Sequence, residues 1–415
     1  MKLFLSLILL FHFSASSFGQ DIVQWRGPSR DGIYNEKGLL KTWPEAGPKA
    51  ELEISGFGKG YSQPVVCNSI IYITGIKQDT MDVISAYDMT GKMLWNQIYG
   101  HAWANSFPDT RCTPTIENGK IYLISGMGTV CCLNSADGKI LWSQDGHTPF
   151  NGRYDRWGVS ESVLLTDQVA LYVCGGDETT VVAFDKITGQ LLWKTKSVGG
   201  ARAYVSSLLI EQNGMKIVVA ETSRNLIGIN ALDGEILWNF DLTPFQQVKM
   251  GKGINTNTPL YHNGEIFMTN GYDQTALMLS IAADGRSLSL KWKNEVLDTH
   301  HGGVVLVDGN LYGTNWVDNS KGQWVSLDWA TGKTNWTKEW YSKGSIISAD
   351  GLLYCYEEKG GNIALVQPDT ADFKIISTFK FEGGEGPYWA HPSIYNGKLY
   401  LRHGNIMRSY NIKGV

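Results

Sequence analysis

A short phrase that ends in tryptophan recurs along the chain and constrains its fold more than any other feature. The clearest copies are AYDMTGKMLW to Trp95, CLNSADGKILW to Trp142, AFDKITGQLLW to Trp193, GINALDGEILW to Trp238 and SLDWATGKTNW to Trp336. Degenerate copies end at Trp292 and Phe379. A spacing of roughly 45 to 50 residues is typical of the blades of a propeller. The repeat therefore predicts small sheets arranged radially around one axis.

A hairpin signal lies upstream of each phrase. It consists of Asn-Gly or Asp-Gly between alternating apolar runs, as in TIENGKIYLIS, PLYHNGEIFMT and SIYNGKLYLR. These dipeptides supply the positive φ angles of a type I′ turn. Variants at Asn68-Ser69, Asp167-Gln168 and Asn213-Gly214 complete about eight hairpins. Each unit is thus predicted to hold four antiparallel strands, the last of which ends at the Trp.

The final unit has only three predicted strands, and the segment KAELEIS at residues 49–55 can supply the fourth. We therefore predict an all-β chain: a single eight-bladed β-propeller of four-stranded antiparallel blades, closed by an N-terminal strand completing the last blade. The strand near Leu52 should pair with the strand near Met407. We expect almost no helix, and we expect the Trp residues to pack against the next blade.

The beginning of the chain has the pattern of a secretory signal peptide. One early Lys is followed by the apolar run Leu3 to Phe13 and then by small residues. The sequence therefore divides into a signal peptide at 1–19, an N-terminal extension packing on the propeller at 20–48, and the propeller at 49–415. We expect an exported monomer, periplasmic or extracellular, without a membrane span.

The charge and the cysteine content bear on two properties, nucleic-acid binding and disulfide bonding. The 36 basic and 40 acidic residues give a formal charge of -4, and no run of Lys and Arg forms a basic patch. This excludes nucleic acid as a partner. Six cysteines in a chain of this length do not make a disulfide scaffold, so we expect buried free thiols. Cys131 and Cys132 lie inside a predicted strand, whose regular backbone does not suit a disulfide between neighbours.

The repeat Ala-x-Asp-x-x-Thr-Gly-x-x-x-Trp, clearest in AFDKITGQLLW, resembles the tryptophan-docking repeats of the quinoprotein (PQQ-like) β-propeller superfamily over residues 50–415. That superfamily includes PQQ-dependent dehydrogenases and a non-enzymatic propeller of the outer-membrane assembly machinery. The resemblance implies PQQ with calcium as a candidate cofactor. The family's calcium-binding Glu and Asn and its catalytic Asp have no assignable counterparts here, so the cofactor stays unassigned.

In a propeller, the residues just before the innermost strand of each blade converge on the axis, which gives a candidate site. Cationic, imidazole and aromatic side chains recur there and suit a small polar or anionic molecule. The predicted binding residues are Arg111, Arg153, Trp157, Arg202, Tyr204, Asn255, Asn257, His300, His301, Lys343, Tyr388, Trp389, Arg402 and His403. The predicted catalytic residues are Glu357, Asp273 and His391. In the alternative interpretation, these polar groups only hydrate a channel and cap backbone groups.

A metal site is not predicted. His300 and His301 are chemically able to ligate a metal ion, but adjacent residues in a strand face opposite ways. We therefore expect at most one of the two imidazoles to face the site.

Three functions remain open. The first is binding of a small polar or anionic molecule at the central mouth, which the resemblance extends to quinoprotein-type oxidation of an alcohol or sugar hydroxyl. The second is a scaffold for protein partners, like the outer-membrane assembly propeller; it predicts exposed apolar loops and no convergent cations. The third is a carbohydrate-active lyase or hydrolase that uses His391, Tyr388 or Glu357 as acid and base.

Overall fold

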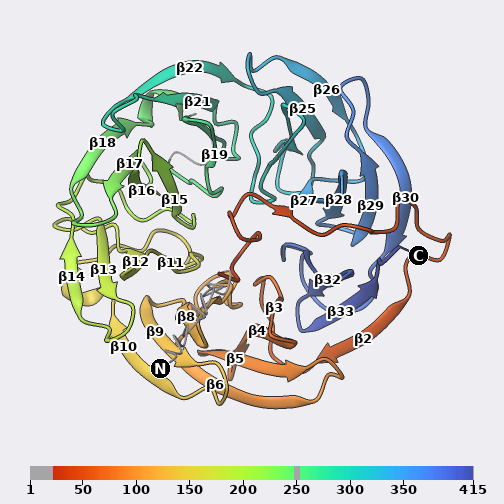
Figure 1. Ribbon diagram of the computed structural model, residues 1–415, viewed down its shortest axis with the longest axis horizontal. Coiled ribbons are helices and arrows are strands. Elements are labelled where there is room, and N and C mark those ends of the chain that lie inside the picture. Colours follow the sequence, from red (N-terminus) through yellow and green to blue (C-terminus); the bar gives the residue numbers. More distant parts are fainter. Residues whose placement is uncertain (1–21, 247–252, 415) are drawn as a thin grey trace, which may run out of the picture.

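The computed structural model describes residues 22–246 and 253–414, so the predicted signal peptide at 1–19 lies outside the described residues. The strands form eight sheets around one axis, as Figure 1 shows, and the predicted eight-bladed β-propeller is confirmed. The only helical elements within the described ranges are the 3₁₀ turns Thr148–Phe150 and Thr243–Phe245. None of the described helices is long and apolar enough to cross a membrane.

The blades follow one another in chain order around the ring. Blade 1 contains β3 (Val65–Cys67), β4 (Ile70–Lys77), β5 (Met81–Asp88) and β6 (Met93–His101). Blade 2 contains β7 (Thr115–Glu117), β8 (Lys120–Ile124), β9 (Thr129–Asn134) and β10 (Ile140–Asp145). Blade 3 contains β11 (Leu164–Leu165), β12 (Val169–Val173), β13 (Val181–Asp185) and β14 (Leu191–Lys194). Blade 4 contains β15 (Leu208–Gln212), β16 (Met215–Glu221), β17 (Asn225–Asn230) and β18 (Ile236–Asp241).

The second half of the ring is built in the same way. Blade 5 contains β19 (Leu260–His262), β20 (Glu265–Met268), β21 (Ala276–Ile281) and β22 (Leu288–Asn294). Blade 6 contains β23 (Val305–Val307), β24 (Asn310–Thr314), β25 (Trp324–Asp328) and β26 (Thr334–Lys338). Blade 7 contains β27 (Gly344–Ala349), β28 (Leu352–Glu357), β29 (Asn362–Gln367) and β30 (Lys374–Lys380). Blade 8 contains β31 (Ser393–Tyr395), β32 (Lys398–His403), β33 (Ile406–Asn411) and β2 (Ala50–Ser55).

The inner hairpins turn as their dipeptides predict. Both turn residues have positive φ in Asn118-Gly119, Asn213-Gly214, Asn263-Gly264, Asp308-Gly309, Asp350-Gly351, Asn396-Gly397 and Asn68-Ser69. Positive φ at both positions matches the right-handed twist of the flanking strands. Neither Asp167 nor Gln168 is among the positive-φ residues, so the hairpin of blade 3 uses another turn.

The repeated Trp residues pack between blades, as predicted. The indole Nε1 of Trp142 donates to the carbonyl of Lys186 at 3.1 Å, in the turn of the following blade. The ring lies against Gly189, where an added Cβ would come 2.7 Å from Trp142 Cδ2. Trp95, Trp193 and Trp292 lie in the same way against Gly138, Gly234 and Gly332. In these four blades, the glycine of the turn phrase thus gives the preceding blade's Trp its contact surface, whereas Gly91 and Gly285 meet aliphatic side chains instead.

Blade 8 closes the ring with the two ends of the chain. β2 pairs antiparallel with β33, with Ile54 opposite Met407 and Leu52 opposite Ser409. Ile54 and Met407 are both buried. The predicted closing strand is therefore confirmed, and the last blade has no unpaired outer edge at β33.

The residues just after the predicted leader cross the middle of the ring, where Figure 1 shows them in red. Val23 bridges to Ile116 in β7, and β1 (Ile33–Tyr34) adds a parallel fifth strand to β27. Between these anchors, Arg26 and Arg30 are buried. Sequence reasoning did not identify this strand or this crossing.

Both arginines donate to backbone carbonyls that lie at or just before the innermost strands. Arg26 donates to the carbonyls of Gly302, Ile346 and Val304. Arg30 donates to the carbonyls of Ser162, Ser207 and Val163. The guanidinium groups therefore satisfy backbone oxygens that face the central channel on several blades.

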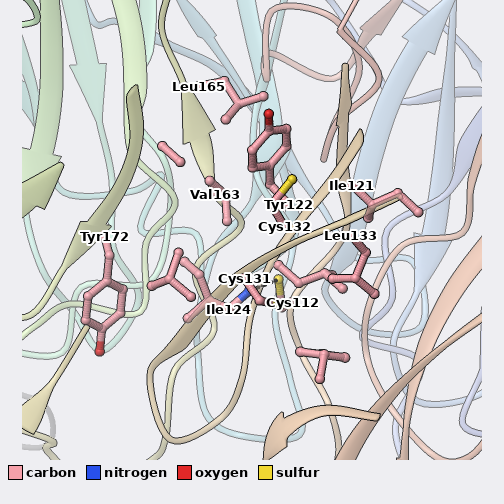
Figure 2. Close-up of a cluster of buried hydrophobic side chains, with 14 of the residues drawn as sticks. Cys112, Ile121, Tyr122, Ile124, Cys131, Cys132, Leu133, Val163, Leu165 and Tyr172 are labelled. Atoms are coloured by element: carbon pink, nitrogen blue, oxygen red, sulfur yellow. Dashed lines mark hydrogen bonds between the residues drawn. The ribbon is translucent and has the colours of Figure 1, made fainter. Parts of the chain in front are cut away.

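The core lies between adjacent blades. Figure 2 shows part of the cluster that spans blades 1 to 3, where Cys132 of β9 lies beside Tyr122 of β8 and the backbone N–H of Ile124 donates to Cys112 Sγ. All six cysteines of the chain lie in the described part, and all are buried free thiols. The prediction of structural thiols is confirmed, including for the Cys131-Cys132 pair.

Candidate functional site

A cavity of about 610 Å³ lies at the axis of the ring. Every blade contributes to its wall, mainly through the segment that precedes its innermost strand. The connections β20–β21, β24–β25 and β28–β29 add Tyr272, Asn319 and Glu358. Trp25 of the N-terminal segment completes the wall, so the segment that crosses the channel also lines the cavity.

The cavity brings together part of the predicted set. The predicted residues in its wall are Arg111, Trp157, Tyr204, His300, His301, Trp389 and His391. Sequence reasoning did not select Trp25, Tyr61, Phe107, Glu358 and Lys359, which also line it. Glu358 lies one residue from Glu357, which was selected, so an error of one position explains that omission. Trp25 had no such signal, because it lies outside the repeats.

Most of the predicted cations lie elsewhere. Arg202 is buried and forms a 3.3 Å ion pair with Glu161. Arg402 donates to the carbonyls of Ser62, Thr74 and Gly58 and thereby ties blade 8 to blade 1. The expectation of several convergent cations is wrong for these groups, because a buried guanidinium must find acceptors within the protein.

Other predicted polar residues also form structural contacts away from the cavity. Asn255 donates to the carbonyl of Thr222, and Asn257 donates to that of Thr299. The ring of His403 lies 3.5 Å from that of Tyr388 and contacts the carbonyls of Gly383 and Gly386. Arg153 is exposed and pairs with Asp177. These residues hold loops and blades together.

Lys343 was expected in the shared pocket but lies behind its wall. It is 1% exposed, and its Nζ lies 2.8 Å from Glu358 Oε1 and 2.8 Å from the carbonyl oxygen of Asp318. A buried ammonium group requires such acceptors. Lys343 therefore positions Glu358, whose carboxylate does line the cavity.

The predicted catalytic residues do not form an acid–base set. Glu357 is buried and accepts from the backbone N–H groups of Lys359 and Gly360, so it shapes the β28–β29 turn. Asp273 is exposed and is not among the lining residues. His391 does line the cavity, but both of its ring nitrogens are engaged.

Nδ1 of His391 lies 3.1 Å from Arg26 Nη1, and its Nε2 lies 3.0 Å from the carbonyl oxygen of His301. Since Arg26 is a donor only, Nδ1 accepts and Nε2 carries the proton. Burial, followed by the charge of Arg26, holds the pKa of His391 well below its usual range. The imidazole is therefore a neutral group fixed between the cavity wall and the N-terminal segment that crosses the ring at residues 22–34, which we call the plug.

His300 and His301 depart from the sequence prediction. They lie in an irregular segment between β22 and β23 rather than in a strand, so the strand alternation that we assumed does not apply. Both rings line the cavity, with centroids 4.2 Å apart. Together with Glu358 they form a group whose potential metal-ligating atoms lie within 4.8 Å of one another.

Some polar atoms of His300, His301 and Glu358 have hydrogen-bond partners, and others have none. His300 Nε2 lies 2.9 Å from Tyr272 Oη. Within the described residues, His300 Nδ1 and His301 Nε2 have no hydrogen-bond partner. Burial lowers the pKa of both imidazoles, with nearby positive charge acting in the same direction. Burial also raises the pKa of Glu358, an effect that Lys343 opposes.

The rest of the wall is aromatic and hydroxyl-bearing. Trp389 lies 5.0 Å from Tyr61 and 5.4 Å from Phe107, measured between ring centroids. The hydroxyl side chains in the wall are Ser160, Ser162, Ser206, Thr256, Thr258 and Ser320. Arg111 lies among them and donates to the carbonyl of Ser106. Such a wall offers flat apolar faces, short hydrogen-bonding groups and a positive charge.

Comparison with known proteins finds one family model and a sequence relative that carry the same description. The family model described as "Outer membrane protein assembly factor BamB" matches residues 80–338. BamB of Moranella endobia (strain PCIT) is 23% identical over 273 residues, which cover 61% of this chain and 63% of that protein. The alignment thus spans less than two thirds of that relative.

Among solved structures, BamB from Moraxella catarrhalis has a TM-score of 0.65 at 10% identity and covers 88% of this chain and 99% of that chain. The quinohemoprotein alcohol dehydrogenase from Comamonas testosteroni has a TM-score of 0.68 at 12% identity and covers 93% of this chain and 79% of that chain. At these identities the likeness shows the fold alone.

The cavity residues do not fit a PQQ–calcium pair. PQQ carries three carboxylates, whereas the positively charged side chains lining this cavity are Arg111 and Lys359. Calcium takes six to eight oxygen ligands. The cluster at His300, His301 and Glu358 instead offers two imidazole nitrogens and one carboxylate. We therefore derive no chemical step through this cofactor.

Proposed function

The chain belongs to the family described as outer membrane protein assembly factor BamB, and we propose that this member binds a small polyhydroxyl molecule or sugar acid in the cavity at the axis of its ring. The composition of the cavity wall carries the proposal. Broad aromatic faces pack against the C–H faces of a sugar ring, while hydroxyl side chains exchange hydrogen bonds with its hydroxyl groups. Arg111 supplies a charge-assisted contact to a carboxylate.

One buried hydroxyl supports a ligand directly. Ser160 is a residue of the cavity wall, and its Oγ is buried with no hydrogen-bond partner within the described residues. A buried polar atom left unpaired costs about 1–3 kcal/mol, which a ligand hydroxyl would recover. Binding is the function that the geometry supports best. Hydroxyl oxidation needs a base at the ligand, neither Glu357 nor Asp273 lines the cavity, and the Glu358 carboxylate in the wall is paired with Lys343 at 2.8 Å.

The proposal extends to where the protein works. The leader pattern of residues 1–19 and the family's description as an outer membrane protein assembly factor both support export. An exported binding protein would meet sugars and sugar acids outside the cytoplasm. A monomer is sufficient for this function, because a single ring supplies the whole cavity wall.

Saturation-transfer NMR with D-glucuronate and D-glucose tests the proposed ligand class. The wild type should bind both, and Arg111→Ala should weaken glucuronate binding by about tenfold or more while changing glucose binding little, because a charge-assisted hydrogen bond contributes roughly 1.5–3 kcal/mol. Arg153→Ala is the matched control, since Arg153 is exposed and pairs with Asp177 outside the cavity. Absence of transfer to both sugars would overturn the proposal.

A scaffold for protein partners is the second candidate, and one surface feature favours it. Leu94, Leu141 and Leu192 occupy the same position on β6, β10 and β14, the outer strands of three successive blades. Their exposures are 46%, 46% and 48%. Exposed apolar side chains repeated on neighbouring blades are typical of a protein-binding surface.

The scaffold proposal predicts that Leu94, Leu141 and Leu192 matter for assembly. Replacing all three by Asp should abolish the chain's ability to restore outer membrane protein assembly in cells that lack their own BamB. Arg111→Ala should leave that restoration intact. The opposite pattern would assign the function to the cavity instead.

A further inference from the structure

Two imidazoles and a carboxylate meet on one side of the cavity, although they come from different blades. His300 and His301 precede β23 of blade 6, and Glu358 follows β28 of blade 7. His301 Nε2 lies 3.6 Å from Glu358 Oε2. Two ligands bound to one tetrahedral ion at about 2.1 Å lie roughly 3.4 Å apart. This pair of atoms is therefore already spaced for a shared ion.

The unpaired atoms point to a missing partner. His300 Nδ1 and His301 Nε2 are buried and lack a hydrogen-bond partner within the described residues. Each of the two imidazoles contributes one nitrogen to a group whose potential ligand atoms lie within 4.8 Å of one another. Leaving buried polar atoms unpaired is unfavourable unless something else binds there.

Tyr272 and Lys343 contact the side chains of this cluster, as hydrogen-bonding neighbours usually contact the ligands of a metal ion. Tyr272 Oη lies 2.9 Å from His300 Nε2 and can accept its proton, which leaves Nδ1 as the free nitrogen. Lys343 Nζ lies 2.8 Å from Glu358 Oε1, which leaves Oε2 on the side of His301. In His300 and Glu358, the other polar atom of the same side chain is thus engaged, which leaves His300 Nδ1 and Glu358 Oε2 for an ion.

We propose that His300, His301 and Glu358 form a binding site for a borderline divalent transition-metal ion such as Zn²⁺. Imidazole nitrogens suit zinc and its neighbours, whereas calcium and magnesium prefer a shell made of oxygens. Three protein ligands leave a coordination position open, and here that position faces the cavity. A bound ligand oxygen could occupy it, a consequence that rests on the proposed sugar-binding function.

Zinc titration of the metal-stripped full chain, purified without a histidine tag, tests the site without any sugar. The wild type should bind one equivalent of Zn²⁺ by isothermal titration calorimetry, and Co²⁺ should give visible absorption bands. His301→Gln should weaken zinc binding more than about 100-fold, and Tyr272→Phe about tenfold, because second-shell changes typically cost 10–100-fold. His262→Ala is the control, since His262 is exposed and lies away from the cavity wall.

The outcomes separate the metal site from the sugar site. Unchanged zinc affinity in His301→Gln, no stoichiometric binding by the wild type, or equal affinity for Ca²⁺ would each overturn the metal proposal. If His301→Gln fails to fold by circular dichroism, Tyr272→Phe carries the same test. Zinc binding without transfer to glucuronate would support the metal site and contradict the sugar proposal, and the reverse result would do the opposite.

Discussion

Replacing Trp142 with Ala tests whether the repeated Trp residues hold the ring together. Trp142 is buried against Gly189 of the next blade and donates its Nε1 proton to the carbonyl of Lys186. Truncation of a buried Trp costs about 3–5 kcal/mol through the cavity that it leaves. The lost hydrogen bond contributes about 1 kcal/mol of the free energy of unfolding. We therefore expect a loss of roughly 4–6 kcal/mol.

The assay is urea unfolding followed by far-ultraviolet circular dichroism, with the wild type measured in parallel. Trp142→Phe should lose less than Trp142→Ala, since it keeps part of the apolar contact. Leu192→Ala is the control, because Leu192 is 48% exposed on an outer strand and should change stability by about 0.5 kcal/mol or less. A loss below about 1 kcal/mol for Trp142→Ala, with unchanged denaturant slope, would refute the interpretation of these residues as inter-blade contacts.

Three further changes test the closure, the plug and a buried carboxyl group. Ile54→Asp places a charge in the buried face of β2 that meets Met407, which should detach β2 and expose the edge of β33. Size-exclusion chromatography should then show aggregates. A monomer that melts like the wild type would contradict ring closure by β2. Arg26→Met removes the donor from several channel carbonyls and should cost roughly 3–5 kcal/mol, with faster proteolysis within residues 22–34; an unchanged cleavage rate would argue against the plug. Burial raises the pKa of Glu221 to about 8, above its unfolded value, so the native state retains a proton and stability falls as pH rises from about 4.5 to 8. Glu221→Gln should therefore melt progressively higher than the wild type across that range, and a difference that does not vary with pH would contradict this.

The architecture could be predicted because its determinants are local and repeated. The Gly of the turn phrase and the Trp recur in sequence and pack on each other in four places, and the Asn-Gly hairpins recur as well. The closing strand followed from counting strands in the last unit. The N-terminal crossing could not be found in this way, because Arg26 and Arg30 bind backbone carbonyls of distant blades, and carbonyls leave no sequence signal.

The site was harder to predict because convergence on the axis does not decide which way a side chain points. Arg111 and Lys343 both precede inner strands, yet Arg111 lines the cavity while Lys343 lies behind Glu358. Because the ammonium group of Lys343 is buried, it pairs with the carboxylate of Glu358, and Glu358 is the residue that lines the cavity. For His300 and His301, the irregular backbone before β23 removed the alternation that a strand would impose.

A crystal structure of the protein soaked in D-glucuronate tests the central claim most directly. We predict density for one sugar acid inside the cavity, with its carboxylate at Arg111 and its ring against Trp389, both of which line the wall. The same soak of Arg111→Ala should leave the cavity without the sugar acid. Density only on the outer surface of the ring, or none in the wild type at saturating sugar, would contradict the assignment of the cavity as the functional site.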